Sequence, residues 1–372
     1  MAVKVCHVTS VHHAKDVRIF HKECASLAKV YDVYLIAPNV ENEVDKGVHI
    51  VGVELPESRL KRLLYLNKIY RKALEIDASI YHFHDPELMK IGLKIKKKGK
   101  KVIFDSHEDV PDQILDKPYI PQLIRRPLSK LYARIEKSLF RQYDTLITVT
   151  PHIVERLIKI NPQTVMITNY PIIQKDEQPH WRNIPFGERM YVCFAGSISP
   201  HYRHERVIKC IEKTDVKYLL AGHIDHDYFE KLKILKSWDK VEYRGVVPFD
   251  KVKEIYSESF AGIVYPEYRP NAGYKRGTIG VLKMFEFMYA GIPVIATDFD
   301  LWKEIIEKNE CGICVNPYKD DKLTEAISYY RNHPKMAQKH GENGRQLVVE
   351  KYNWGTQEPL LYSVYESLLG ES

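Results

Sequence analysis

Residues 281–300 read VLKMFEFMYAGIPVIATDFD, and the stretch combines a helix, a glycine corner and a strand. Residues 281–288 are apolar at almost every position, which predicts a largely buried helix. Ala290-Gly291 ends this helix, because glycine readily adopts the conformation that follows a last helical turn. The run that begins at Pro293 (PVIA) has the continuous apolar character of a strand in a parallel sheet. A helix that leads into such a strand is the repeating unit of α/β folds.

The same alternation of strands and helices extends along the whole chain. Strand-like runs are predicted at residues 3–8, 33–37, 48–53, 80–84, 102–105, 146–150 and 165–168, and then at 191–195, 217–221, 241–244, 262–265, 293–296 and 312–315. Amphipathic helical stretches lie between many of these runs, for example at residues 19–28 and 60–74. This pattern predicts parallel sheets with crossover helices.

The chain has 372 residues, too many for one ordinary hydrophobic core, so two domains are predicted. The stretch 169–188 contains several prolines among polar residues and shows no periodicity, which is typical of a linker. We therefore predict a first domain over residues 1–175 and a second over residues 186–353. The final segment, residues 354–372, is predicted to be a helix that packs back on the first domain.

The composition indicates a globular protein, with 44% hydrophobic and 28% charged residues. The apolar runs have the length of strands, so no transmembrane helix is expected. The chain enters a strand at once, without the pattern of a signal peptide, and Cys6 and Cys193 lie inside strand-like runs. These features predict a cytoplasmic protein with reduced thiols. Cys311 and Cys314 have the spacing of half a zinc site or a redox pair, but no second pair lies nearby, which favours a structural role.

The net charge of +7 belongs to the first half of the chain. Residues 1–180 carry 29 Lys and Arg against 22 Asp and Glu, whereas residues 181–372 carry 27 of each. The basic residues concentrate in segments 59–72, 94–101 (KIKKKGKK) and 125–141. Such a surface suits an anionic bilayer, an anionic substrate or nucleic acid, and a solvated lysine-rich face is the alternative. Nucleic acid is disfavoured, because the basic residues lack interleaved aromatics on a recognisable binding module.

Polar clusters follow three predicted strands of the first domain. They comprise His12, Asp16 and Arg18 after the first strand, His84 and Asp85 after the fourth, and His107 and Glu108 after the fifth. Ligands of open parallel sheets bind beyond the carboxyl ends of the strands. Three consecutive clusters at one edge therefore predict a binding site there, although a single strand-end histidine is more often structural.

In the second domain, Gly196-Ser197 follows a strand and precedes Arg203 and Arg206. Glycine at such a turn lets backbone N–H groups approach an anion, and arginine adds planar donors for phosphate. This turn has neither a Walker lysine motif nor G-x-G-x-x-G, and the first turn of the chain also lacks both. Their absence disfavours a P-loop NTPase and a dinucleotide oxidoreductase.

Lys283 and Glu286 are three residues apart and share one face of the apolar helix. A carboxylate in such surroundings needs hydrogen-bond donors. One interpretation is that Glu286 accepts hydrogen bonds from ligand hydroxyls such as those of a ribose. The other is a simple Lys283–Glu286 ion pair.

The run KMFEFMYAGIPVIA (283–296) resembles the donor-site signature of glycosyltransferase family 4, which comprises retaining enzymes with the GT-B fold. The likeness extends to HVTSVHHAKDVRIFHKE, YHFHDPEL, DSHED and FAGSIS, and it covers nearly the whole chain. These motifs look like those of the bacterial members that assemble capsule, O-antigen and exopolysaccharide. The resemblance implies an α/β protein with two Rossmann-like, doubly wound domains that face each other across a cleft.

The resemblance also implies site residues. Glu286 matches the glutamate that binds the ribose hydroxyls, Gly196 and Ser197 match the turn near the phosphates, and His84 matches the histidine that faces the transferred sugar. Lys283 and Arg203 fall where basic residues meet the diphosphate, with Arg206 as the competitor of Arg203. Many members carry a second glutamate eight residues before Glu286, and this chain has Thr278 there instead.

The function implied is transfer of a sugar, with retention, from a nucleotide-diphosphate sugar to a saccharide or lipid-linked acceptor in surface polysaccharide biosynthesis. A UDP-sugar is favoured, His84, Arg203 and Lys283 are the catalytic candidates, and no metal or other cofactor is expected to be obligatory. The basic first domain suggests a peripheral position on the inner face of the cell membrane. A nucleotide-sugar epimerase on the same fold and a non-catalytic membrane-surface scaffold are the alternatives.

Overall fold

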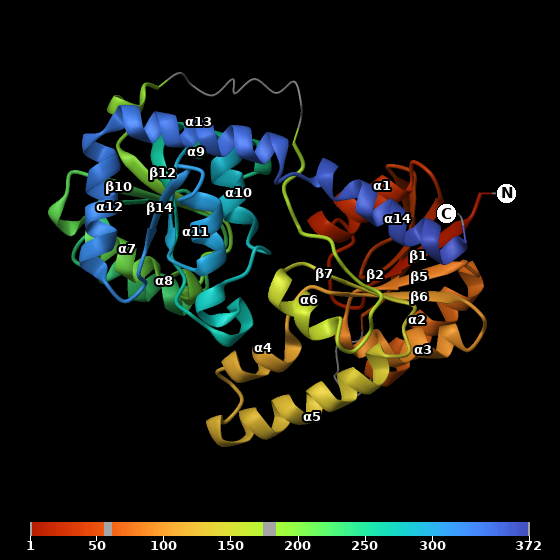
Figure 1. Ribbon diagram of the computed structural model, residues 1–372. Coiled ribbons are helices and arrows are strands. Elements are labelled where there is room, and N and C mark those ends of the chain that lie inside the picture. Colours follow the sequence, from red (N-terminus) through yellow and green to blue (C-terminus); the bar gives the residue numbers. More distant parts are fainter. Residues whose placement is uncertain (1, 56–61, 174–183, 371–372) are drawn as a thin grey trace. The chain divides into compact units, whose positions relative to one another are not determined.

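The computed structural model describes residues 2–55, 62–173 and 184–370, and the chain divides into two compact units (Figure 1). Unit 1 comprises Met1–Asn169 together with Trp354–Ser372, and unit 2 comprises Tyr170–Asn353. The first unit therefore ends at Asn169, the first residue of the proline-containing stretch, and not at the predicted residue 175. Unit 2 likewise begins earlier than the predicted residue 186.

Unit 1 contains an eight-stranded sheet with the order β3-β4-β2-β1-β5-β6-β7-β8. Its strands are β1 (Lys4–Val8), β2 (Asp32–Pro38), β3 (Glu43–Asp45), β4 (Val48–Val53), β5 (Ile80–Phe83), β6 (Lys101–Ser106), β7 (Thr145–Thr148) and β8 (Thr164–Met166). The neighbours pair in parallel except β3, which is antiparallel to β4. The sequence did not predict β3, because this three-residue edge strand has no apolar alternation.

Helices cover both faces of this sheet (Figure 1). They are the π-helix η1 (Val17–Cys24), which continues into α1 (Ala25–Leu27), and α2 (Arg62–Ile76), α3 (Met89–Lys96), α4 (Val110–Asp116), α5 (Gln122–Phe140), α6 (Pro151–Leu157) and α14 (Glu358–Leu369). Successive residues of a strand point to opposite faces, so Cys6 and Val8 enter one core and Val5 enters the other. The closing segment lies on the face that η1 covers, where Trp354 Nε1 donates to Ser26 Oγ at 2.9 Å.

Unit 2 contains a six-stranded parallel sheet with the order β11-β10-β9-β12-β13-β14. Its strands are β9 (Tyr191–Ala195), β10 (Lys217–Ala221), β11 (Val241–Tyr243), β12 (Ser259–Val264), β13 (Val294–Thr297) and β14 (Gly312–Val315). Its helices are α7 (His204–Cys210), α8 (His226–Lys233), α9 (Phe249–Glu258), α10 (Leu282–Tyr289), α11 (Asp300–Ile306), α12 (Asp320–Asn332) and α13 (Pro334–Glu350). Both units are thus α/β layers around parallel sheets, as predicted.

The stretch 281–300 forms helix α10, a turn and strand β13, as its pattern predicted. Met284, Phe285, Phe287 and Met288 are buried. Gly291 has a φ of +73°, a conformation that L side chains rarely adopt. In the described part of the chain, no helix combines the length with the apolar content that crossing a membrane requires.

Candidate active site

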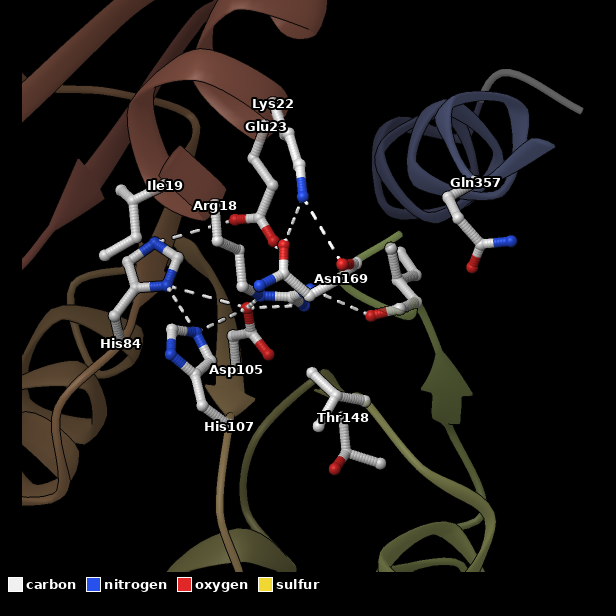
Figure 2. Close-up of polar contacts among 12 residues, drawn as sticks. Arg18, Ile19, Lys22, Glu23, His84, Asp105, His107, Thr148, Asn169 and Gln357 are labelled. Carbon is white, nitrogen blue, oxygen red and sulfur yellow. Dashed lines mark hydrogen bonds and ion pairs between the residues drawn. The ribbon is translucent and has the colours of Figure 1, made fainter. Parts of the chain in front are cut away.

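A buried ion pair between Arg18 and Asp105 forms the centre of the strand-end cluster in unit 1 (Figure 2). Arg18 Nε and Nη2 each lie 2.9 Å from Asp105 Oδ2, and Nη1 donates to Ile167 O at 2.9 Å. Burial by itself would raise the pKa of Asp105, but Arg18 and His107 outweigh it and hold this pKa well below its ordinary value. Asp105 is therefore an ionised carboxylate that can orient its neighbours.

Two histidines lie close to the Asp105 carboxylate, and they differ in how exposed their side chains are. His107 Nε2 lies 2.9 Å from Asp105 Oδ2, and its side chain is 20% exposed. The His84 side chain is 0% exposed, and its Nε2 lies 2.9 Å from His7 Nδ1. Burial lowers the pKa of His84 to about 4, so its ring is neutral. Within unit 1 the His107 side chain is partly exposed, and the buried His84 ring lies next to it. The sugar-facing role of His84 stays a prediction.

A second carboxylate–imidazole pair, His12 and Asp85, lies beside the first. His12 Nε2 is 3.3 Å from Asp85 Oδ1, while Asp85 Oδ2 accepts from the Thr9 hydroxyl at 2.7 Å and from the Ser10 N–H at 2.6 Å. Burial opposes ionisation of Asp85, but these donors lower its pKa to about 2. The rings of His12 and His107 lie 5.5 Å apart, so the edge of the sheet presents two imidazoles, each oriented by a carboxylate.

The pKa of His12 is raised by its hydrogen bond to Asp85, although partial burial acts against it. Because the folded-state pKa is raised, the pair stabilises the fold fully below about pH 6.5 and loses this contribution as pH rises through the His12 pKa. We expect the C2 proton of His12 to titrate above pH 6.5 in an NMR experiment, and at lower pH in Asp85→Asn. Equal midpoints in the two proteins would show that the pair does not form in solution.

Asp16, Arg18 and Glu108 also come from the predicted loops. Asp16 acts as the N-cap of η1, where its side chain accepts from the backbone N–H groups of Arg18 and Ile19. The Glu108 carboxylate accepts from the Gln113 side chain, and burial raises its pKa. In this structure Asp16 and Arg18 therefore position the site, while His12 and His107 are partly exposed and Glu108 is an exposed residue at its edge.

The cluster also contains residues that the sequence did not single out, namely His7, Lys22, Glu23, Asn169 and Tyr365. Arg18 Nη2 lies 3.1 Å from Glu23 Oε1. An α-helical period places residues five apart on different faces, but a π-helix bonds residue i to i+5, so these two side chains meet. Because an α-helix was predicted over residues 19–28, the sequence did not indicate that Arg18 and Glu23 contact each other.

In unit 2, Gly196, Lys283 and Glu286 come together at the carboxyl end of β9. A Cβ atom placed on Gly196 would lie 2.5 Å from Lys283 Cε, so the lysine side chain crosses this turn closely because glycine leaves room. Lys283 Nζ donates to Glu286 Oε2 at 2.6 Å, and the Tyr256 hydroxyl donates to the same oxygen at 3.2 Å. The Glu286 side chain is 12% exposed. The structure thus contains the Lys283–Glu286 pair, and both donors use one carboxylate oxygen.

The two candidate arginines of unit 2 have different surroundings. Arg203 is buried, donates to Pro317 O, and lies near the rings of Tyr265 and Tyr318. Arg206 is partly exposed, and its Nη1 lies 2.6 Å from Asp320 Oδ2. Arg203 would have to leave the Pro317 carbonyl before its Nη1 could bind a diphosphate.

Other positions of unit 2 lie as follows. Ser197 is exposed next to Gly196. Lys275 Nζ pairs with Asp298 at 2.9 Å. Thr278 O accepts from Trp302 Nε1 at 2.6 Å, so a hydrogen bond holds the backbone at the position where the resemblance led us to expect a glutamate. Cys311 and Cys314 are free thiols, and burial raises the pKa of Cys311 to about 12.

Both halves of the chain match known protein families. Residues 18–169 match Glycosyltransferase Family 4, and residues 175–347 match Glycosyl transferases group 1. The fold is similar to that of sucrose-phosphate synthase from Thermosynechococcus elongatus, with a TM-score of 0.77, 17% identity and full coverage of both chains. The chain carries both domains of a GT-B glycosyltransferase.

Two further proteins resemble this chain. Anabaena HepE in complex with UDP and glucose has a TM-score of 0.71 at 12% identity, over 98% of this chain and 100% of that one. The lipopolysaccharide core biosynthesis mannosyltransferase LpcC of Rhizobium leguminosarum bv. viciae is 32% identical over 91 residues. That match spans 24% of this chain and 26% of LpcC.

Proposed function

We propose that the protein transfers a hexosyl group from a nucleotide-diphosphate sugar, with a UDP-sugar favoured, to a saccharide or lipid-linked acceptor in surface polysaccharide biosynthesis. The observation that carries the proposal is the convergence of Gly196, Lys283 and Glu286 at one strand end of unit 2. A glycine turn, a cation and a carboxylate suit a phosphate and a ribose. HepE, a protein of the same fold, has UDP and glucose bound, and LpcC is a mannosyltransferase.

The donor would bind unit 2. Lys283 would turn from Glu286 to the diphosphate, and Glu286 would accept the ribose hydroxyls. In the reaction the bond between the anomeric carbon and the phosphate oxygen breaks, and the acceptor hydroxyl oxygen bonds to that carbon on the same face. The acceptor proton passes to the leaving phosphate. Lys283 and Arg203 stabilise the charge that develops on the diphosphate, so the chemical step needs no obligatory divalent ion.

The acceptor would bind unit 1 at the pairs His12–Asp85 and His107–Asp105. Both imidazoles are partly exposed, and both are oriented by a carboxylate. Such groups suit the hydroxyls of a sugar, because an imidazole nitrogen can donate or accept a hydrogen bond. His84 would support His107 from the buried side.

The test is an assay with UDP-, GDP- and dTDP-sugars, with and without saccharide and lipid-linked acceptors. We expect release of nucleotide diphosphate that depends on the acceptor, and a product whose anomeric configuration by NMR matches that of the donor. An epimerised sugar formed without acceptor would replace the proposal with an epimerase. A lack of both transfer and hydrolysis with every donor would favour the non-catalytic scaffold.

The membrane is a further proposed partner. In the basic segment 59–72, Arg59 and Lys61 lie outside the described residues, while Lys68 is exposed on α2. Helix α5 offers a better surface, because it exposes leucine and isoleucine side chains beside basic ones. These are Leu123, Ile124, Leu128, Leu131 and Ile135, with Arg126, Lys130, Arg134 and Lys137. A helix with this composition binds in the plane of an anionic membrane surface.

Replacement of Leu131 and Ile135 by glutamate should reduce binding to vesicles that contain anionic lipid by at least about tenfold. The physical reason is that two apolar side chains no longer enter the bilayer interface, and two negative charges meet an anionic surface. Co-sedimentation at low and high salt measures the effect, with Leu360→Glu, an exposed leucine on α14, as the matched control. Equal binding of the double variant and the wild type would exclude α5 as the docking helix.

A further inference from the structure

Unit 1 contains four buried side chains with the composition of a metal site: His7, His82, His84 and Glu23. In the parallel pairing of β1 with β5, His7 lies opposite His82. His84 lies two residues after His82 and therefore on the same face of the sheet. Helix η1 covers this face and contributes Glu23. The topology thus brings three imidazoles and a carboxylate into the interior of one unit.

The distances among these groups are short enough for a shared cation. His7 Nδ1 lies 2.9 Å from His84 Nε2, and Glu23 Oε2 lies 3.9 Å from each of these nitrogens. One ligand atom from each of the four residues falls within 4.8 Å of the others. Among the described residues, His82 Nε2 and Glu23 Oε2 make no hydrogen bond, whereas Glu23 Oε1 lies 3.1 Å from Arg18 Nη2. Buried polar atoms without partners are costly, and a bound cation would satisfy them.

Each of the three histidines has a second ring nitrogen, called here its outer nitrogen, that is not one of the candidate ligand atoms. Each outer nitrogen lies near an oxygen atom. The Tyr365 hydroxyl lies 3.0 Å from His7 Nε2 and 2.9 Å from His82 Nδ1, and its oxygen can accept both N–H groups. His84 Nδ1 lies 3.6 Å from Asp105 Oδ2. With protons on the outer nitrogens, the inner nitrogens of His7 and His84 carry lone pairs; these two nitrogens lie 2.9 Å from each other and 3.9 Å from Glu23 Oε2. Metal-binding histidines are oriented in this way by oxygen atoms on their far side.

We propose that His7, His82, His84 and Glu23 bind one divalent cation of the zinc class as a structural site of unit 1. Imidazole nitrogens with one carboxylate are a ligand set that suits Zn²⁺, and four protein ligands are typical of structural rather than catalytic zinc. Burial also keeps the histidines neutral, which is the form that binds metal, since it lowers the pKa of His82 well below its ordinary value. Arg18 contacts Glu23 through Oε1, so Oε2 remains for the cation.

The competing arrangement has a proton in place of the cation. Burial raises the pKa of Glu23 well above its ordinary value, so without metal this carboxyl group holds a proton. The proton would then lie in a hydrogen bond to Asp105 or to one of the histidines, and a second proton would lie between His7 and His84. Metal binding would release the Glu23 proton. The two arrangements differ in metal content, which can be measured directly.

The experiment uses the full chain, purified without a metal-affinity tag, stripped with a chelator and titrated with Zn²⁺ and Co²⁺. We expect one Zn²⁺ per chain by mass spectrometry and a melting temperature about 5–10 °C higher at saturating Zn²⁺. Co²⁺ should give the intense visible bands of a four-coordinate site. Absence of stoichiometric uptake, or uptake without a change in melting temperature, would overturn the proposal in favour of the protonated cluster.

Two variants locate the metal. Tyr365→Phe keeps the ring in the core but removes the oxygen that faces two histidines, and it should weaken Zn²⁺ binding about 10–100-fold in competition with a chromophoric chelator. Glu23→Gln should lose the intense Co²⁺ bands. The matched control is His204→Gln in unit 2, a buried histidine whose Nδ1 lies 2.8 Å from the Tyr218 hydroxyl, and it should bind metal as the wild type does. Wild-type affinity in both cluster variants would place any bound metal elsewhere and overturn the site.

Discussion

Replacement of Lys283 by alanine is expected to lower the turnover number about 100–1000-fold. Lys283 crosses the Gly196 turn and now donates to Glu286, so its ammonium group lies where a diphosphate would contact that turn. Loss of one preorganised donor to a developing negative charge typically costs a factor of that size. Initial-rate measurements at saturating donor and acceptor give the turnover number, and the variant should retain the wild-type fold by circular dichroism.

The chain provides a closely matched control for this substitution. Lys322 also pairs with a glutamate three residues later, Glu325, at 2.7 Å on a helix of unit 2. Lys322→Ala removes a similar ion pair from an exposed face and should leave turnover unchanged. If both variants lost activity equally, the loss would reflect the stability of unit 2. If neither lost activity, Lys283 would not stabilise the leaving group.

The fold follows from the sequence wherever local pattern decides the structure. The apolar runs predicted the long parallel strands, because a strand covered on both faces is apolar at nearly every position. Strand β3 was missed, because Glu43–Asp45 is short, antiparallel and exposed at the sheet edge. Helix η1 was expected to be an α-helix, since a π-helix has no periodicity that a short sequence reveals.

Some residues of the candidate sites could likewise be predicted from local sequence, whereas others are brought together only by the tertiary structure. His107 directly follows strand β6, so the position of a strand end was enough to suggest it, and Asp105 lies two residues earlier inside the same strand. The contact of His7 with Tyr365 joins residues 358 positions apart, and only the packing of the closing helix on the sheet creates it. His7 and His82 lie inside strands and, considered alone, are ordinary core residues. Their significance depends on the strand order, which places β1 beside β5.

The role of Glu286 depends on which of two partners its carboxylate serves. In this structure it accepts from Lys283 and from Tyr256, and both bonds reach Oε2. If Glu286 had a purely structural role, the contacts with Lys283 and Tyr256 would be sufficient to account for it. A ribose role would use Oε1 as well, and it would explain why a partly buried acid occupies one face of an otherwise apolar helix. Substitution by glutamine separates the roles, because it keeps the volume of the side chain but removes its charge and one acceptor.

Glu286→Gln is expected to weaken binding of the nucleotide diphosphate about 10-fold to a few hundred-fold, since hydrogen bonds to a charged group contribute about 1.5–3 kcal/mol each. The empty protein should melt within a few degrees of the wild type, because the Lys283 pair is partly exposed and such pairs contribute about 1 kcal/mol or less. Calorimetric titration with UDP gives the affinity, and a thermal melt without ligand gives the stability. Glu325→Gln, in the matched exposed pair, should alter neither. Wild-type affinity together with a lower melting temperature would make Glu286 a structural partner of Lys283, and the ribose would then need another acceptor in unit 2.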